Sequence, residues 1–358
     1  MDTIEIKNHG ISIHMDRSIY KQCHLICTKM CGGLNTQGTL ATGNWHKVVL
    51  SLILLWAIEA AVVNPQALEG CDDHCGNVSI PYPFGTREGC YLNKTFLITC
   101  NSTYNPPLAF WGTGTINVTQ IWLSGELRIY SRVAEDCYNQ SGGKTSNIRP
   151  WIKLAKFPIS NTKNKFTAIG CDTYAVISGS KGTSYKTGCL SLCDRNESVI
   201  NGSCSGIGCC QTDIPKGVKA LNISLYSYYD HRRVWNFNPC SYAFVAEEGT
   251  YNFSVQDLRD FRNRTMKTPV VLNWAIGDQN CSEAKKDLKS YVCTSKDNRT
   301  VCHDSENRPG YWCSCSKGFE GNPYLPDGCQ GYHIHLSNII YWSSFSDFYV
   351  TDNGLLTF

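Results

Sequence analysis

Cysteine is the residue type whose number and spacing point most directly to chemistry in this chain. The 358 residues include 21 cysteines, and 18 of them lie between Cys71 and Cys329. An even, dense set within one segment is typical of a disulfide framework formed in an oxidising compartment. Zinc binding is the competing hypothesis, but the spacings are irregular and paired C-x-x-C knuckles are absent. We therefore predict nine disulfides between residues 71 and 329.

Acceptor sequences for N-linked glycans, N-x-[S/T], occupy the same segment. Their confinement between Cys71 and Cys329 predicts passage through the secretory pathway and a surface that carries glycans. The twelve asparagines are Asn77, Asn93, Asn101, Asn117, Asn139, Asn196, Asn201, Asn222, Asn252, Asn263, Asn280 and Asn298.

Positive charge is concentrated between Cys137 and Thr187. Eight Lys and Arg residues and one acid, Asp172, give 8 − 1 = +7, whereas the whole chain carries +3. Trp151 and Phe157 lie among these residues, so a cationic surface with aromatic neighbours could bind carboxylates. The alternative is a set of solvated loop lysines, each contributing about 0–1 kcal/mol to any ion pair. The residues predicted to contact a ligand are Lys144, Arg149, Trp151, Lys153, Lys156, Lys163 and Lys165.

Enzymatic chemistry is not predicted. Glycoside hydrolysis needs two positioned carboxylates, and no acid lies in a motif that would position a pair. Kinase signatures, namely a Gly-rich loop before a VAIK-like strand, HRD and DFG, do not occur. The candidate acids are Asp72, Asp73, Glu126, Glu135 and Asp136.

Three short sequences could bind a metal or act as a redox switch. The string "CDDHC" could bind a metal, but its cysteines belong to the predicted disulfide set. The string "HIH", His333 to His335, could do the same, but it lies in a tail that we expect to be disordered. The adjacent Cys209 and Cys210 could form a redox switch, although two ordinary disulfides to different partners are the interpretation we favour. We predict no metal site and no cofactor.

The elements that carry these residues are predicted to be mostly strands. Gly and Pro recur about every ten residues, between short runs rich in β-branched and aromatic residues, which favours antiparallel strands. The string "IWLSGELRIY" predicts a hairpin that turns at Ser124–Gly125, and one short helix is predicted over Ser282–Val292. The predicted fold class is mainly β, in small, disulfide-rich extracellular domains. The clearest strand runs are 95–100, 119–133, 174–178, 219–229 and 240–255.

A secretion signal is predicted upstream of the cysteine-rich segment. Eleven largely apolar residues, Val48–Ile58, are too few to span a bilayer, which takes about 20. They fit the hydrophobic core of a signal peptide over residues 48–67, with cleavage between Ala60 and Ala67. Residues 1–47 form an atypical leader, and initiation at Met30 would give a more ordinary signal. The protein is expected to be secreted, or membrane-anchored if residues 48–63 stay uncleaved.

Several motifs resemble the extracellular region of plant wall-associated receptor kinases. They are "GCDDHCGNVSIPYPFGTREGC", "GELRIYSRVAEDCYNQSG", "NGSCSGIGCCQTDIP" and "NFNPCSYAFVAEEGTYNFSVQDL", and the resemblance runs from Cys71 to Gly277. It implies a galacturonan-binding, cysteine-rich domain over residues 71–175 and a second cysteine-rich domain, of the wall-associated-kinase type, over residues 176–277. The implied ligand is pectin in the cell wall, specifically de-esterified homogalacturonan. Other receptor ectodomains are further partners to consider, and nucleic acid is not.

A six-cysteine segment over residues 281–329 resembles an epidermal-growth-factor-like (EGF-like) module. Its C-x-C sequence followed by Gly-Phe carries the resemblance, together with "GNPYLPDGCQ". The resemblance implies the pairs Cys281–Cys302, Cys293–Cys313 and Cys315–Cys329, whereas the sequence alone leaves 15 pairings open. The usual calcium-binding consensus is missing, since "AIGDQNC" precedes the first cysteine. Calcium is therefore not expected.

Residues 330–358 are predicted to be a disordered tail outside the family. They contain no cysteine and no glycan acceptor, and polar residues break their apolar runs well short of a membrane span. We expect a pectin-binding receptor ectodomain truncated before its membrane span and kinase, or else a full receptor whose gene model was cut short. The alternative function is a receptor ectodomain that binds a peptide or protein without carbohydrate specificity.

Overall fold

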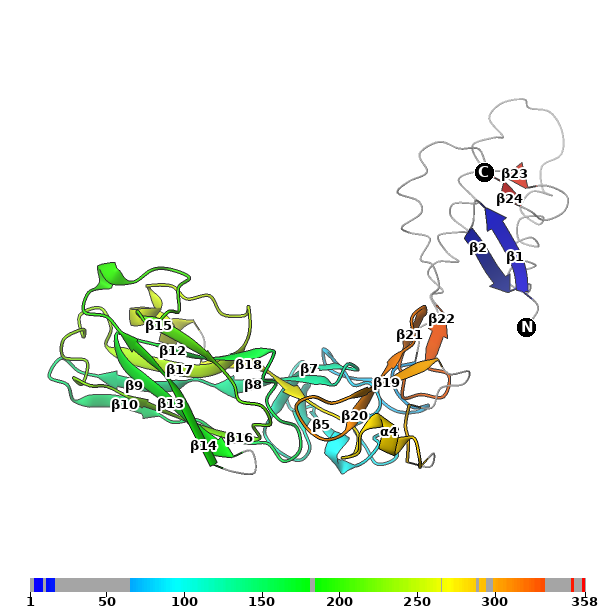
Figure 1. The fold of residues 1–358 in the computed structure, drawn as a ribbon, viewed down its shortest axis with the longest axis horizontal. Coiled ribbons are helices and arrows are strands. Elements are labelled where there is room, and N and C mark those ends of the chain that lie inside the picture. The colour runs from blue at the N-terminus through cyan, green and yellow to red at the C-terminus, as the bar shows by residue number, and fades with distance from the viewer. Residues whose placement is uncertain are drawn as a thin grey trace. The chain divides into compact units, whose positions relative to one another are not determined.

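A computed structural model describes residues 65–180, 184–264, 266–287, 290–293 and 299–331, together with four terminal strands. The chain divides into two units, residues 1–63 with 332–358, and residues 64–331. In the first unit β1 (Thr3–Asn8) pairs with β2 (Ile11–Asp16), and β23 (Tyr349–Val350) pairs with β24 (Leu356–Thr357) (Figure 1). The apolar segment 48–63 and His333 and His335 lie outside the described residues, so the predictions about them stay predictions.

The second unit is built mainly from antiparallel strands, as the sequence predicted. One five-stranded sheet has the order β18-β8-β7-β6-β5. Its strands are β5 (Ile98–Asn101), β6 (Leu108–Trp111), β7 (Asn117–Trp122), β8 (Glu126–Arg132) and β18 (Lys267–Asn273).

Two further sheets complete this part of the unit. A second five-stranded sheet has the order β10-β9-β17-β12-β15, and a four-stranded sheet has the order β11-β16-β13-β14. The strands of the five-stranded sheet are β9 (Ala134–Tyr138), β10 (Lys144–Ile148), β12 (Asn164–Ile169), β15 (Cys209–Asp213) and β17 (Cys240–Glu247). Those of the four-stranded sheet are β11 (Trp151–Lys153), β13 (Asp172–Ser180), β14 (Ser184–Leu192) and β16 (Ala220–Tyr226).

The predicted hairpin at Ser124–Gly125 is confirmed. Strands β7 and β8 pair in antiparallel fashion, with Trp122 opposite Glu126 at the turn. Gly125 has φ +83°, which disfavours any residue with a side chain, and a Cβ there would lie 3.1 Å from the carbonyl oxygen of Trp274. The turn therefore requires glycine both for its backbone angle and for close packing.

The predicted helix over Ser282–Val292 is much shorter than expected. It is α4 (Cys281–Ala284), whose N-terminus is capped by Asn280, and hydrogen-bonded turns continue it to Asp287. At the far end the amide of Val292 donates to the hydroxyl of Tyr311, and Cys293 is bonded to Cys313. These tertiary contacts hold the end of the segment against another strand and override its helix propensity. The other short helices of the described residues are η1 (Lys94–Phe96), η2 (Asn196–Ser198), α3 (Asp257–Asp260) and η3 (Phe261–Asn263).

The predicted domain boundary at 175/176 falls inside β13. This strand pairs with β14 on one side and with β16 on the other, so both halves of it belong to one sheet. Strand β18, from the second predicted domain, pairs along its whole length with β8 from the first. The division into two domains at this position stays a prediction, and the sheets do not follow it.

The six-cysteine segment forms two small hairpins. Strand β19 (Thr300–Asp304) pairs with β20 (Tyr311–Cys315), and β21 (Phe319–Gly321) pairs with β22 (Cys329–Gly331). Because Gln330 and Gly331 lie in β22, the prediction that disorder begins at residue 330 is wrong for these two residues. A further small hairpin near the start of the unit joins β3 (His74–Cys75) to β4 (Val78–Ser79).

All 18 cysteines from Cys71 to Cys329 are paired, which confirms the predicted framework of nine disulfides. The adjacent Cys209 and Cys210 bond to Cys204 and Cys189 respectively, as the favoured interpretation required. The three pairs of the EGF-like segment are those that the resemblance implied: Cys281–Cys302, Cys293–Cys313 and Cys315–Cys329. The remaining pairs are Cys71–Cys90, Cys75–Cys100, Cys137–Cys240 and Cys171–Cys193.

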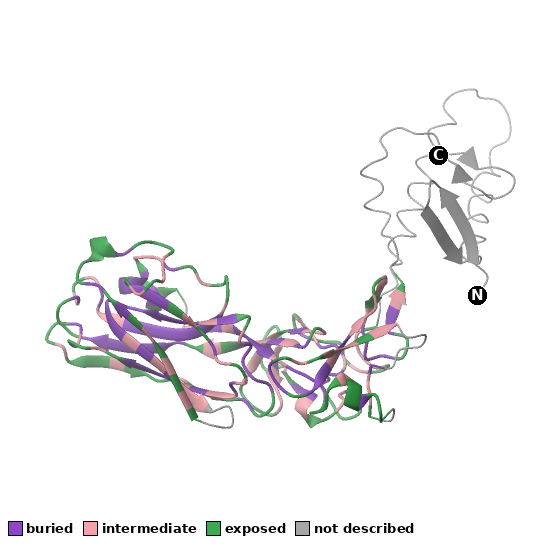
Figure 2. Cartoon of the chain, in the orientation of Figure 1, coloured by how far each residue is buried: buried purple, intermediate pink, exposed green. Residues whose placement is uncertain are grey.

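A buried aromatic cluster lies where the sheets meet the six-cysteine segment. Phe84 lies edge-on to Phe96 and to Trp274, with ring centroids 5.1 and 5.4 Å apart. Trp274 also contacts Tyr324 at 5.7 Å, and Phe157 joins the cluster at 0% exposure. Phe157 is thus a core residue, and it offers no surface to a ligand. Figure 2 shows how buried residues run along the strands of this unit.

A buried asparagine ties the six-cysteine segment to the start of the unit. The side-chain amide of Asn322, which is 0% exposed, donates to the carbonyl oxygens of Gln66 and Tyr82 at 2.7 and 2.8 Å. Its side-chain oxygen accepts from the amide of Tyr324 at 3.0 Å. Three polar groups from different segments therefore depend on one side chain.

We predict that Asn322→Ala lowers the free energy of unfolding by about 2–4 kcal/mol, because it leaves buried polar groups without partners. Denaturant unfolding with the disulfides intact, followed by circular dichroism, measures the change. Asn161→Ala is the matched control, since its side chain makes no hydrogen bond to a described residue. Equal, small effects of the two substitutions would show that Asn322 does not hold these segments together.

Candidate ligand-binding surface

The outward side of the four-stranded sheet presents aromatic side chains. On β13, Ala175 and Ile177 are buried while Tyr174 is half-exposed, so side chains alternate between the core and the outer side. Tyr174 lies opposite Tyr226 of β16, and the two rings stack with centroids 4.8 Å apart. Tyr228 lies 5.2 Å from Tyr174 and is 58% exposed. The sheet register thus assembles an accessible row of tyrosines.

Asp172 holds the turn that presents Tyr228 and Tyr229. Its carboxylate accepts hydrogen bonds from Ser227 Oγ at 2.5 Å, from the amides of Tyr228 and Tyr229 at 2.9 Å, and from the amide of His231 at 3.1 Å. Burial alone would raise the pKa of Asp172, but these hydrogen bonds outweigh burial and the pKa lies below its ordinary value. The single acid of the basic segment is therefore a buried structural group.

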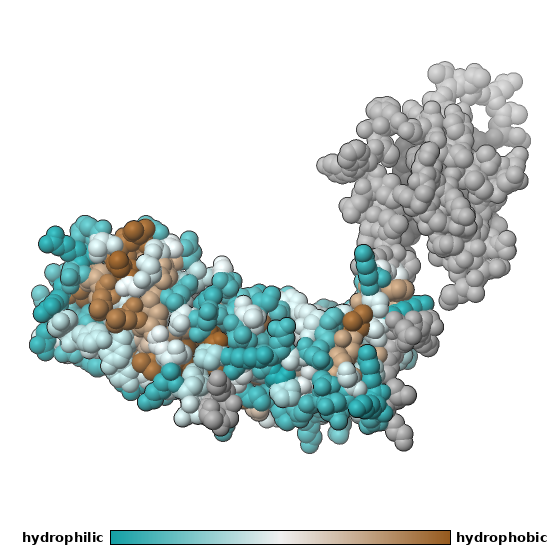
Figure 3. All heavy atoms as spheres, in the orientation of Figure 1, coloured by the Kyte–Doolittle hydropathy of each residue, from teal (hydrophilic) through white to brown (hydrophobic). Residues whose placement is uncertain are grey.

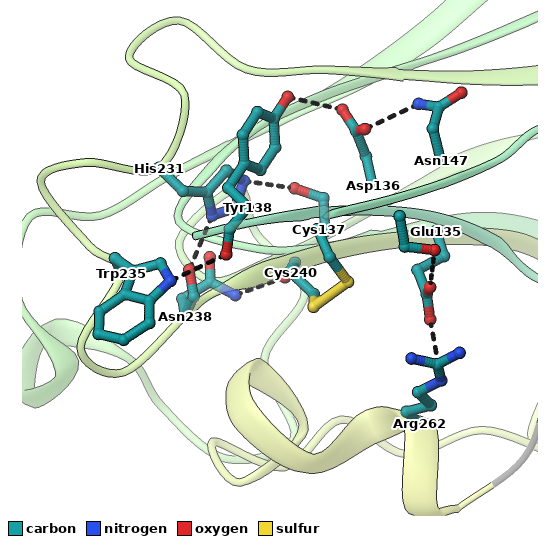
Figure 4. Close-up of a disulfide and its surroundings, with 12 residues drawn as sticks. Glu135, Asp136, Cys137, Tyr138, Asn147, His231, Trp235, Asn238, Cys240 and Arg262 are labelled. Carbon is teal, nitrogen blue, oxygen red and sulfur yellow. Dashed lines mark hydrogen bonds and ion pairs between the residues drawn. A yellow bond between two sulfur atoms is a disulfide. The ribbon is translucent and has the colours of Figure 1, made fainter. Parts of the chain in front are cut away.

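His231, the last residue that Asp172 holds, lies in the neighbourhood of the Cys137–Cys240 disulfide (Figure 4). His231 is 0% exposed, and its ring stacks on Tyr138 at 4.9 Å. Its Nδ1 donates to the carbonyl of Asn238 at 2.7 Å, so Nε2 accepts from the hydroxyl of Ser241 at 2.8 Å. Burial lowers the pKa of His231, although hydrogen bonding to Asn238 opposes it. The imidazole is thus a fully buried group that packs against the turn.

Two arginines lie against these tyrosines without a carboxylate partner among the described residues. The guanidinium of Arg149 lies 5.9 Å from the ring centre of Tyr226, and that of Arg233 lies 3.8 Å from the ring centre of Tyr229. Such cation–π contacts keep a guanidinium in place while its N–H groups can still meet an anion. The tyrosine–arginine surface comprises Arg149, Tyr174, Tyr226, Tyr228, Tyr229 and Arg233.

The predicted ligand residues do not gather into one strip. Lys144 is paired with Asp136 at 2.8 Å, Lys163 with Glu126 at 3.7 Å, and Lys165 with Asp213 at 2.7 Å. These three lysines are thus largely neutralised by acids from other segments, which the charge count over residues 137–187 did not include.

The other predicted residues lie on or beside β11. Arg149 belongs to the tyrosine–arginine surface, and Trp151 and Lys153 are exposed on β11 itself. Lys156 is exposed in the following turn, and it makes no ion pair with a described residue. Arg149, Lys153 and Lys156 are therefore available to an anionic ligand, and Trp151 presents an exposed indole beside them.

The four tyrosines of this surface and Arg233 are not among the ligand residues that the sequence predicted. A signal was present in "SLYSYYDHRR", where three tyrosines and two arginines fall within ten residues. Its partner Tyr174 comes from a distant strand, so only the sheet register brings the whole set together.

A hollow of about 460 Å³ lies between the β7–β8 turn and the six-cysteine segment. Asp304 and Glu306 line it, together with His303 and Trp312, whose rings stack at 4.1 Å. No Lys or Arg lines this hollow. Its acids would repel an anionic ligand, so it is a poorer candidate for carboxylates than the tyrosine–arginine surface.

The described residues contain no group of three or more His, Cys, Asp or Glu side chains arranged to hold a metal. In "CDDHC", Cys71 and Cys75 are bonded to Cys90 and Cys100, and His74 pairs with Asp73 at 2.8 Å. Within the same described part of the chain, every helix is too short or too polar to cross a bilayer.

Comparison with known proteins gives one family match. Residues 71–131 match the family described as wall-associated receptor kinase galacturonan-binding. Wall-associated receptor kinase 2 of Arabidopsis thaliana is 41% identical over 280 residues, which cover 77% of this chain and 36% of the relative. Wall-associated receptor kinase 5 of the same plant is 37% identical over 290 residues, 80% of this chain and 38% of the relative. The chain thus spans little more than a third of these relatives' length, and no solved structure matches it.

The matched segment itself is not cationic. It contains three basic residues and four acids, so its formal charge is 3 − 4 = −1. Arg128, one of the three, already pairs with Glu247 at 2.8 Å and lies 4.8 Å from the ring centre of Trp122. The unpaired arginines of the tyrosine–arginine surface lie outside this segment.

We predict that Asp172→Asn lowers the free energy of unfolding by about 2–4 kcal/mol at neutral pH, since the turn loses a buried charged acceptor. Because the folded state depresses the pKa of Asp172, its stabilisation is present above the unfolded value of about 3.9 and is lost as pH falls through the lower folded value. The gap between wild type and variant should therefore shrink in acid.

Urea unfolding of both proteins across a pH series measures this gap. Asp213→Asn is the control, because its carboxylate is 79% exposed and holds only the pair with Lys165. A cost for Asp172→Asn no larger than that of the control, or a gap independent of pH, would contradict the role given to Asp172.

Proposed function

The chain is a wall-associated-receptor-kinase-like protein, and from that premise we propose that it binds galacturonan in the plant cell wall. The observation that carries the proposal is the match of residues 71–131 to a galacturonan-binding family. The finer part of the proposal is the ligand, de-esterified homogalacturonan, and the surface that meets it.

The chemistry of the ligand favours the tyrosine–arginine surface. Galacturonan is a chain of sugar rings that each carry a carboxylate, unless it is esterified. Guanidinium groups bind carboxylates through paired N–H donors, and the negative face of an aromatic ring attracts the C–H groups of a sugar. Arg149 and Arg233 supply the first contact, and exposed tyrosines such as Tyr226 and Tyr228 supply the second. Lys153 and Lys156 extend the positive charge alongside.

The form of this surface predicts weak binding at each site. It is open to solvent rather than enclosed, so water screens each ion pair and salt weakens the binding further. A polymer offers many copies of the same anion, and repeated engagement raises the overall affinity without new contacts. Esterification removes the charge and should reduce binding.

The covalent features of the chain support an extracellular location. Nine disulfides fit an oxidising compartment. Eleven of the twelve glycan-acceptor asparagines lie among the described residues, and none of them is buried. Their side chains are therefore accessible for the N-linked glycans that the sequence predicts.

A protein or peptide partner is the second candidate, because apolar side chains adjoin the same surface. Leu190 lies opposite Tyr174 on β14, and Leu190 and Leu192 are 47% and 43% exposed. Figure 3 shows apolar residues gathered at the end of the unit that carries β13 and β15. Binding through these leucines would depend little on salt, whereas galacturonan binding should weaken as salt is raised.

We predict that Arg149→Gln with Arg233→Gln reduces binding of a de-esterified oligogalacturonide at least tenfold, which corresponds to about 1.4 kcal/mol. Calorimetric titration at low and at physiological salt, on protein shown to be folded by circular dichroism, measures the loss. Lys165→Gln is the control, since Lys165 is already paired with Asp213, and it should change binding less than about twofold.

Three outcomes separate the parts of this proposal. Unchanged binding by the folded Arg149→Gln, Arg233→Gln variant would show that galacturonan contacts another surface. Lys94 and Tyr130 are exposed residues of the matched segment 71–131. If Lys94→Gln with Tyr130→Ala abolishes binding instead, the contact lies on that segment. If the parent protein binds no oligogalacturonide at low salt, the proposed function itself is wrong.

A further inference from the structure

A hollow of about 440 Å³ lies on the outward side of the four-stranded sheet, beside the tyrosine–arginine surface. Its floor is a row of residues that face one another across all four strands. Trp151 of β11 pairs with Asn222 of β16, Asn222 with Ser178 of β13, and Ser178 with Lys186 of β14. The volume falls at the small end of the range for ligand sites, about 300–1,000 Å³.

Asn222 points into this hollow. Its neighbours Leu221 and Ile223 are buried in the core, so the alternation of a strand directs Asn222 to the outer side. It lines the hollow, and its side chain makes no hydrogen bond to a described residue. Asn222-Ile-Ser224 is also an acceptor sequence for N-linked glycosylation. The nitrogen that would carry a glycan is therefore free and faces a hollow that is open to solvent.

The walls of the hollow suit a neutral amino sugar. Trp151 is 68% exposed and stands beside Asn222, so its ring can cover one face of the first sugar. Ser178, Ser184 and Lys186 offer hydroxyl and ammonium groups to the sugar's hydroxyl and acetamide oxygens. A glycan here would also shield an indole that otherwise faces water.

The position of Asn222 differs from that of the other acceptors. Strand β16 has β11 on one side and β13 on the other, so a glycan on Asn222 starts in the middle of a sheet. Asn117 also lies within a sheet, but its side-chain amide already donates to the carbonyl of Ala109 at 3.2 Å. Asn77 is exposed, with no hydrogen bond from its side chain to a described residue.

We propose that an N-linked glycan on Asn222 is seated in this hollow, with its first N-acetylglucosamine stacked on Trp151. Trp151 then binds the protein's own glycan, and it is not a contact for galacturonan. The seated glycan forms one wall of the tyrosine–arginine surface and stabilises the outer side of the sheet.

A double-mutant cycle on the protein secreted from plant cells tests the proposal. Mass spectrometry of glycopeptides first measures occupancy at Asn222. Asn222→Gln should then lower the midpoint of thermal unfolding by about 2–4 °C, and in a Trp151→Ala background the same substitution should have almost no effect. Asn77→Gln, which removes a glycan from an exposed site, is the control and should leave the midpoint nearly unchanged.

A second pair of variants separates the glycan from the asparagine itself. Ser224→Ala removes the acceptor sequence and should reproduce the shift, whereas Ser224→Thr keeps the sequence and should not. An unoccupied Asn222, or a shift that is the same with and without Trp151, would overturn the proposal. None of these measurements involves galacturonan, so they stand or fall independently of the proposed function.

Discussion

The rest of the unit depends on the packing of Phe84, Phe96 and Trp274 into one buried cluster. Eight of the nine disulfides join cysteines no more than 25 residues apart, so each of them constrains only a short loop of the chain. Phe84 and Phe96 lie near the start of the unit, whereas Trp274 comes from a distant segment. Trp274 also donates to the carbonyls of Trp122 and Glu126 at the β7–β8 turn. Burying large aromatic side chains therefore supplies the long-range order that the short disulfide loops cannot provide.

The tyrosine–arginine surface is also held in place by buried groups. An open surface binds well only if its side chains are already in place, because ordering them on binding would cost affinity. Asp172 fixes the turn through four hydrogen bonds, and His231 packs against it. Both groups are buried, so they can hold the exposed tyrosines without competing for the ligand.

The sequence predicts local features well and non-local ones poorly. The hairpin at Gly125 and the pairing of Cys209 and Cys210 to different partners follow from short patterns, and the structure confirms them. The cationic surface predicted between Cys137 and Thr187 could not be predicted from short patterns, because acids from other segments decide whether a lysine is free to bind a ligand. Lys165 illustrates this, since Asp213 on the neighbouring strand neutralises it. The tyrosine row likewise exists only through the register of β13 with β16, which no local pattern encodes.

The central claim is that the surface formed by the end of β16, the following turn and β11 meets a carboxylate-bearing sugar chain. Hydrogen–deuterium exchange, with and without a saturating de-esterified oligogalacturonide, tests this claim on the intact glycoprotein. The account predicts added protection in peptides that cover residues 149–153 and 226–233, and none from a fully esterified oligomer. Protection confined to residues 71–131, or equal protection from both oligomers, would contradict it.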